Sequence, residues 1–115
     1  MTRSPTGRKV FITNLGYHDF SKATRYGDVI GVTVGTLNLT DIEALTATIS
    51  DKLKGMTYED YLLIVGKPLV IHLCTDYLLR VRDFPKIRIL YWSAVWNEYV
   101  ELGKEDEIAK EAQVV

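Results

Sequence analysis

The sequence predicts an α/β domain with a small Rossmann-like three-layer arrangement: a mainly parallel sheet of about five strands that ends in an antiparallel hairpin. Short β-branched runs alternate along the chain with segments of helical periodicity, which is the pattern of such layered domains. Residues 61–65 are nearly all apolar, as is typical of a strand covered on both faces. The length of 115 residues suits one domain with its own core.

The first predicted elements are a strand and a short helix. Lys9–Asn14 is a β-branched and aromatic run that ends in turn-forming residues, so we expect a strand there. Asp19 or Ser21 can cap a short helix that continues through Tyr26, and Gly27 is a suitable stop signal.

A second strand is expected over residues 28–34, followed by a longer helix. Thr40 and Glu43 have the spacing of a capping box, with Thr40 as the predicted cap. Apolar residues then recur at helical spacing at Ile42, Leu45, Ile49 and Leu53. The helix is therefore predicted to run to Lys54, before a stop signal at Gly55.

The apolar strand at residues 61–65 leads into the next predicted helix. Pro68 suits the first position of a helix, where a missing N–H costs nothing. We expect this helix over residues 69–82, because Pro85 follows soon after.

The chain closes with a predicted hairpin. Residues 86–92 form a strand, and residues 98–102 are expected to pair back on it through a turn at residues 94–97. The predicted organisation has three parts: a flexible basic arm at residues 1–8, the domain at residues 9–103, and an acidic tail at residues 104–115.

Composition excludes several classes of protein. The formal net charge of −1 gives no overall basic field for duplex nucleic acid. Five basic residues and one acidic residue give residues 1–26 a charge of +4, and two basic and six acidic residues give residues 98–115 a charge of −4. A single cysteine, Cys74, excludes an internal disulfide framework.

Neither a signal peptide nor a membrane span is recognisable, so we expect a cytoplasmic protein.

The expected strand order brings three turns to one edge of the sheet. Right-handed crossovers leave few topologies, and we expect the first and third strands to be central neighbours. In open parallel sheets, ligands bind beyond the carboxyl ends of the strands, where the winding reverses. The turns that follow the first, third and fourth strands therefore hold the candidate site residues.

The first of these turns is rich in polar residues. His18 is the candidate catalytic residue, because a histidine in a loop neither fills a core nor continues a helix, and it can transfer a proton near neutral pH. Asp19 is equally explained as a helix cap. The candidate ligand-binding residues of this turn are Asn14, Gly16, Tyr17 and Asp19.

The second turn, Gly66-Lys67-Pro68, suits an anion. Gly66 allows a ligand to approach the backbone closely, and the helix that follows offers unpaired N–H groups. Lys67 adds a positive charge, and Arg25 on the short helix is a further candidate cation. An ordinary strand-to-helix turn explains the same residues, because the chain lacks a Walker motif and a dinucleotide glycine fingerprint.

The third turn contributes Trp92 and Ser93 as candidate ligand-binding residues. Trp92 can stack on a base, although packing explains a tryptophan on a strand equally well. His72 lies in a predicted helix and is expected to be a core or interface histidine. Cys74, on the same helix, is expected to be a small buried apolar residue.

The composition of this edge favours metal-free phosphodiester chemistry. Hydride transfer requires the missing glycine fingerprint, and a metal centre requires more ligands than the edge contains. Attack by a substrate 2′-hydroxyl needs only a proton-transfer group and cations that stabilise the charged phosphorus. His18 is the candidate for the first role, and Lys67 and Arg25 are the candidates for the second.

Three segments resemble one group of proteins: Thr-Asn-Leu-Gly-Tyr-His-Asp at 13–19, Asp-Tyr-Leu-Leu-Ile-Val-Gly at 60–66, and Ile-Leu-Tyr-Trp-Ser at 89–93. Together they are similar to small Rossmann-like proteins of tailed phages and mobile elements, over residues 9–100. More distantly, the architecture resembles CRISPR-associated ring nucleases and cyclic-oligoadenylate-binding domains. That resemblance implies a small homodimer that cleaves its ligand without a metal ion or cofactor.

The leading hypothesis is a protein that binds and cleaves a cyclic oligonucleotide second messenger. It would be a regulator of CRISPR-type signalling or a phage counter-defence factor. One alternative is a nucleotide sponge, which binds without cleaving. Another is a non-catalytic phage accessory protein, whose contact patch would comprise Tyr91, Trp92, Trp96 and Tyr99. No membrane and no duplex nucleic acid is an expected partner.

Overall fold

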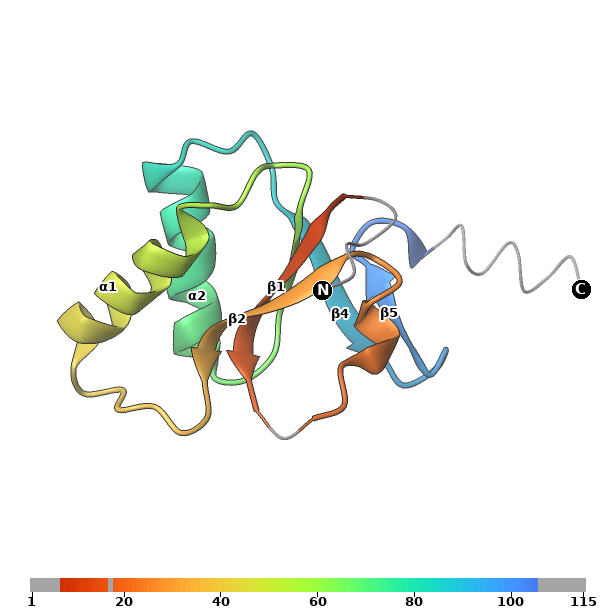
Figure 1. The fold of residues 1–115 in the computed structure, drawn as a ribbon, viewed down its shortest axis with the longest axis horizontal. Helices are drawn as coiled ribbons and strands as arrows, with labels where there is room; N and C mark the ends of the chain where they lie inside the picture. The colour runs from red at the N-terminus through yellow and green to blue at the C-terminus, as the bar shows by residue number, and fades with distance from the viewer. Residues whose placement is uncertain (1–6, 17, 106–115) are drawn as a thin grey trace, which may run out of the picture.

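The computed structural model describes residues 7–16 and 18–105 of the chain. Its centre is a five-stranded sheet in the order β2-β1-β3-β4-β5 (Figure 1). The strands are β1 (Lys9–Leu15), β2 (Asp28–Val34), β3 (Tyr61–Leu63), β4 (Arg88–Ser93) and β5 (Glu98–Glu101). The first four are mutually parallel, and β5 is antiparallel to β4. The predicted fold class and the central position of the first and third strands are confirmed.

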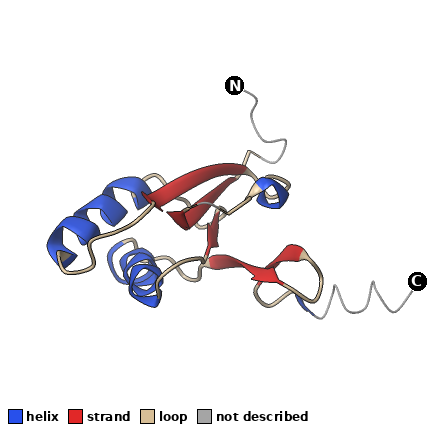
Figure 2. Ribbon diagram, turned by 90° about the horizontal axis from the view of Figure 1, so that it is seen from below, coloured by secondary structure: helices blue, strands red, loops and turns tan. Residues whose placement is uncertain are grey.

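Helices cover the two faces of the sheet unequally. The helices α1 (Ile42–Leu53) and α2 (Pro68–Asp76) lie side by side on one face, whereas the other face carries η1 (Ser21–Ala23) (Figures 1 and 2). Each strand accordingly alternates its side chains between two cores. In β1, Phe11 packs under the two long helices, and Ile12 packs under η1.

The predicted start of α1 is displaced by one residue. Asp41, rather than Thr40, is the N-cap, and its carboxylate accepts a hydrogen bond from the Ala44 N–H at 3.1 Å. The Thr40 hydroxyl instead bonds to the Asn38 side chain in the preceding loop. The end of the helix agrees with the prediction, because Lys54 is its C-cap.

The second long helix also differs in detail from the expectation. It begins at Pro68, and after Asp76 it continues as a π-helical turn, η2 (Tyr77–Val81). His72 is exposed, so of the two expected places the core is wrong, whereas an interface stays a prediction. Cys74 is fully buried, as expected.

The short helix near the start is reduced to the single 3-10 turn η1. Its N-cap is Phe20, so the expectation that Asp19 or Ser21 is the cap is wrong. Asp19 instead accepts a hydrogen bond from the Ser21 N–H at 2.9 Å. Gly27 is required by close packing: a Cβ there would lie 2.4 Å from the Arg8 carbonyl oxygen.

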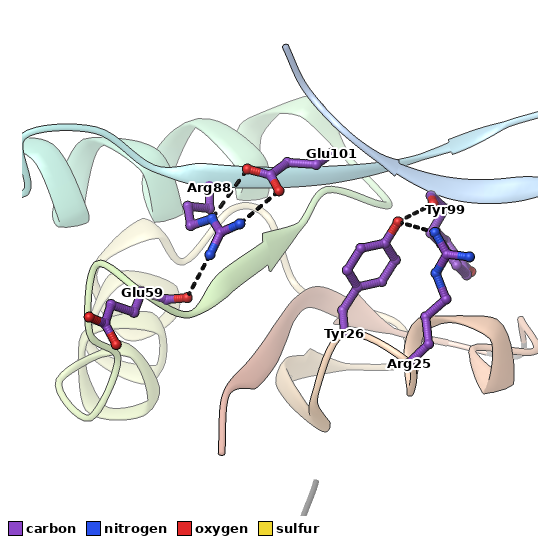
Figure 3. A network of polar contacts seen from close by, with 6 residues as sticks. All are labelled: Arg25, Tyr26, Glu59, Arg88, Tyr99 and Glu101. Carbon is purple, nitrogen blue, oxygen red and sulfur yellow. Dashed lines mark hydrogen bonds and ion pairs between the residues drawn. The ribbon is translucent and has the colours of Figure 1, made fainter. Parts of the chain in front are cut away.

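Two polar networks involve the hairpin of β4 and β5: one joins its two strands, and the other fastens it to the segment after η1 (Figure 3). In the first, the Arg88 guanidinium donates two hydrogen bonds to Glu101, at 2.9 and 3.2 Å. These bonds are the main reason that the pKa of Arg88 lies above its ordinary value. In the second, the Tyr26 hydroxyl donates to the Tyr99 carbonyl at 2.8 Å and accepts from Arg25 at 2.7 Å. The first network therefore stabilises the pairing of β4 with β5, and the second holds β5 against the segment after η1.

The burial of Cys74 leads to a prediction about its reactivity. Burial raises the pKa of its thiol to about 12, and the thiolate is the form that reacts with thiol reagents. At about pH 8, we expect a disulfide reagent such as DTNB to modify the folded protein only as slowly as the protein opens. Denaturing guanidinium chloride should expose one fast-reacting thiol per chain. Fast modification of the native protein would contradict the structure.

Candidate functional site

A pocket of about 470 Å³ opens at the carboxyl edge of the sheet, on the face that carries η1. We call it the aromatic pocket. Its lining is His18, Asp19, Phe20, Lys22, Ile64, Val65, Trp92, Asn97 and Tyr99. These residues come from the loop after β1, the exit of β3, the end of β4 and the hairpin. The volume lies within the range of about 300–1,000 Å³ typical of small-molecule sites.

Three rings form the apolar wall of the aromatic pocket. Trp92 and Tyr99 are partners across the hairpin and pack edge to face, with ring centroids 5.0 Å apart. Phe20 also stacks on Tyr99, with ring centroids 6.4 Å apart. Tyr99 is buried, and its burial raises the pKa of its hydroxyl. Trp92, by contrast, is 45% exposed, so part of its ring is available to a ligand.

Opposite charges border this wall. The Lys22 ammonium donates to the Asn97 carbonyl at 2.9 Å and lies 5.6 Å from the centroid of the Trp92 ring. Asp19 is also part of the lining. Its pKa is lowered, chiefly because the backbone N–H of Ser21 donates to it. Lys22 therefore places a cation beside an exposed aromatic face, while Asp19 stays anionic at neutral pH.

A second pocket of about 400 Å³ adjoins the first. We call it the glycine pocket. Its lining is Asn14, Gly16, His18, Gly35, Thr36, Val65 and Gly66. These residues belong to the carboxyl ends of β1, β2 and β3 and to the loops that follow them. Because His18 and Val65 line both pockets, the two pockets are neighbours at one edge.

The side chain of Asn14 is held at the boundary of the glycine pocket. Its Nδ2 donates to the Gly35 carbonyl at 3.2 Å, which fixes the orientation of the amide. Its Oδ1 is buried and has no hydrogen-bond partner within the described residues. Buried polar atoms are nearly always paired, so this oxygen is unusual.

A buried threonine joins the two strands between the pockets. The Thr13 hydroxyl donates to the Val65 carbonyl and accepts from the Val65 N–H at 2.8 Å. The Thr33 hydroxyl donates to the Thr13 carbonyl at 2.6 Å. These bonds tie the carboxyl ends of β2 and β1 to the exit of β3, where Val65 contributes to both pockets.

Most of the candidate site residues do come together at this edge. Asn14, Gly16, His18 and Gly66 line the glycine pocket, and His18, Asp19 and Trp92 line the aromatic pocket. Tyr17 lies outside the described residues.

Three candidates lie elsewhere. Lys67 is exposed and is the N-cap of α2, directly after Gly66, but it is not among the described residues that line the two pockets. Arg25 pairs with Glu98 at 3.5 Å and bonds to Tyr26, so its guanidinium helps to anchor the hairpin (Figure 3). Ser93 accepts a hydrogen bond from the Trp96 N–H inside the hairpin turn.

Sequence reasoning missed several lining residues. Gly35 and Thr36 follow β2, and because β2 is parallel to β1, the rule that selected the other turns applies to this turn as well. Tyr99 and Asn97 reach the site through the hairpin register, in which Trp92 pairs with Tyr99. Lys22 carried no sequence signal beyond its place soon after His18.

The described residues hold no group of three or more histidine, cysteine, aspartate and glutamate side chains that could bind a metal ion. Within the same part of the chain, no helix is long and apolar enough to cross a membrane.

The family model described as Phage Pam3 gp32-like protein matches residues 8–105. A search of curated proteins and a search of solved structures each gave no match.

The threonine link between β1 and β3 can be tested by removing its hydroxyl. Thr13→Val keeps the shape of the side chain but leaves the N–H and C=O of Val65 without this partner, so we expect a loss of about 2 kcal/mol in the free energy of unfolding. The matched control is Thr48→Val on the exposed surface of α1, which should change stability by less than about 0.5 kcal/mol. Urea denaturation measures both. Equal effects would show that the link contributes little.

Proposed function

The chain belongs to the Phage Pam3 gp32-like protein family, and from this phage membership and the paired pockets we propose that it binds a nucleotide at the carboxyl edge of its sheet. The proposed ligand is a cyclic oligonucleotide second messenger, whose phosphodiester bond the protein cleaves without a metal ion. In a phage family, this activity would serve counter-defence, because destroying a host signal silences the response that depends on it.

The proposal rests on one observation: His18 lines two adjacent pockets, one with an aromatic wall and one lined by glycines. A nucleotide has an aromatic base at one end and an anionic phosphate at the other. The exposed ring of Trp92 offers a stacking surface for the base, and stacking on an aromatic side chain contributes about 1–3 kcal/mol. Lys22 provides a cation beside it, and the glycine pocket offers open backbone.

The chemistry that fits these residues uses a nucleophile supplied by the substrate. The 2′-oxygen of a ribose attacks the adjacent phosphorus, its proton departs, and the bond from phosphorus to the 5′-oxygen breaks. The products are a 2′,3′-cyclic phosphate and a 5′-hydroxyl. The imidazole of His18 either takes the proton of the 2′-hydroxyl or protonates the leaving 5′-oxygen. Lys22, or Lys67 at the start of α2, stabilises the added negative charge, whereas Arg25 is engaged with Glu98 and is left out of the proposal.

Binding can be tested with the two tryptophans of the hairpin. We expect cyclic oligoadenylates to bind the wild-type protein in a calorimetric titration, and Trp92→Ala to weaken binding about 5- to 150-fold through the loss of stacking. Trp96→Ala is the matched control, because Trp96 is similarly exposed, at 38%, but lies outside the lining of the aromatic pocket. Equal losses in the two variants would contradict the assigned pocket.

Turnover can be tested with the two histidines. In the presence of EDTA, we expect wild-type protein to convert a cyclic oligoadenylate to linear products, and His18→Ala to lower the rate by about 10²- to 10⁴-fold. His72→Ala, on the exposed face of α2, should keep the full rate. Thermal melting shows whether each variant is folded.

The same assays separate the alternatives. Tight binding without products would identify a nucleotide sponge. Absence of binding would favour a phage accessory protein that uses the exposed tip of the hairpin, where Val95 is 85% exposed and Trp96 lies beside it. Tyr99 is buried, so it is not part of such a surface, contrary to the expected patch.

A further inference from the structure

The aromatic pocket contains a polar group that stacking on Trp92 does not use, the hydroxyl of Tyr99. Among the described residues that line this pocket, Tyr99 alone carries a hydroxyl. We infer that it donates a hydrogen bond to an acceptor atom on the edge of the base and so helps to select the base. This inference rests on the proposed function and makes Tyr99 a specificity-determining residue of that site.

The ring of Tyr99 is held in place by its neighbours. Only 6% of the residue is exposed. Trp92 packs edge to face against the ring at 5.0 Å, and Phe20 stacks on it at 6.4 Å. The Tyr99 carbonyl accepts a hydrogen bond from the Tyr26 hydroxyl at 2.8 Å, which holds the main chain as well. A ligand therefore meets a phenol that is already ordered, which lowers the entropic cost of binding it.

The hydroxyl of Tyr99 is poorly paired for so enclosed a group. Its hydrogen bond within residues 7–16 and 18–105 is to the Asp19 carbonyl, and the two oxygens lie 3.5 Å apart. Hydrogen bonds from a hydroxyl to an oxygen usually measure about 2.7–2.8 Å, so this bond is weak. Buried polar groups are nearly always well paired. The hydroxyl can therefore gain free energy by donating to a better placed acceptor on a ligand.

The position of the hydroxyl favours contact with the edge of a base. Asp19 and Tyr99 both line the aromatic pocket, and the hydroxyl lies beside the Asp19 carbonyl. The rings of Trp92 and Tyr99 are inclined at 72° to each other. A base that stacks on the exposed face of Trp92 is steeply inclined to the phenol, so these two cannot stack and must meet through an edge.

The hydroxyl is a donor at neutral pH. Burial raises the pKa of Tyr99, and the negative charge of Asp19 raises it further. Because the ordinary pKa of tyrosine is about 10, the phenol keeps its proton well above neutral pH. A protonated hydroxyl can donate to a ring nitrogen of a base, and the ring nitrogens of adenine are acceptors of this kind.

The experiment removes the donor from the protein and the acceptor from the ligand. The probes are adenosine 5′-monophosphate and its 1-deaza, 3-deaza and 7-deaza analogues, each of which has a C–H in place of one ring nitrogen. We expect one analogue to bind the wild-type protein about 5- to 10-fold more weakly than adenosine monophosphate, through the loss of one hydrogen bond. Tyr99→Phe should weaken binding of adenosine monophosphate by the same factor and leave the affinity for that analogue unchanged.

The matched control is Tyr91→Phe on the same hairpin. The Tyr91 hydroxyl bonds to Glu105 at 2.9 Å, and Tyr91 is not among the described residues that line the aromatic pocket. This variant should keep both the affinity and the discrimination between the four ligands. Thermal melting shows whether each variant is folded. If Tyr99→Phe is unfolded, the wild-type protein still decides, because equal affinity for all four ligands would overturn the inference.

The outcomes separate this inference from the proposed function. If Tyr99→Phe leaves the affinity for adenosine monophosphate unchanged, or weakens all four ligands by one common factor, the role of Tyr99 is overturned while nucleotide binding stands. Failure of the wild-type protein to bind any nucleotide, cyclic oligoadenylates included, would overturn the proposed function and this inference with it.

Discussion

The candidate site depends on one pair of hydrogen bonds, between the Thr13 side chain and the main chain of Val65. The three-residue strand β3 ends at Leu63, so the sheet itself no longer holds the chain at Val65. The hydroxyl of Thr13 acts there as both donor and acceptor and replaces the strand pairing that has ended. Since Val65 lines both pockets, this bond fixes the wall that the two pockets share.

The fold followed from the sequence because its signals are local and repeated. Apolar patterns located every strand and both long helices. The rule of right-handed crossovers left a few strand orders, and the structure has one in which the first and third strands are central neighbours, as expected. The prediction failed where two neighbouring residues are equally good helix caps, and where only tertiary packing determines which face of a helix is exposed. Asp41 and Thr40 are both good caps, and the structure uses the one that reaches the Ala44 N–H. His72 lies in an apolar segment but on the outer face of its helix.

The sequence predicted only those site residues that lie at the carboxyl ends of strands. Asn14, Gly66 and Trp92 were found because parallel strands deliver their carboxyl ends to one edge. Arg25 was selected as a site residue and Lys22 was not, although of the two only Lys22 lines the aromatic pocket. Both lie on the segment after β1, and nothing in the sequence tells which side chain points toward the pocket. The hairpin decides between them: the Asn97 carbonyl binds Lys22 beside Trp92, and Glu98 binds Arg25. Such choices depend on contacts distant in sequence.

The two pockets form one binding site only if the base and the phosphate of one nucleotide occupy them at the same time. A crystal structure with adenosine 5′-monophosphate tests this directly. We expect adenine density against Trp92 and phosphate density among Gly16, Gly35 and Gly66. A nucleotide that occupies another surface, or one pocket with its phosphate directed to solvent, would contradict the joint site.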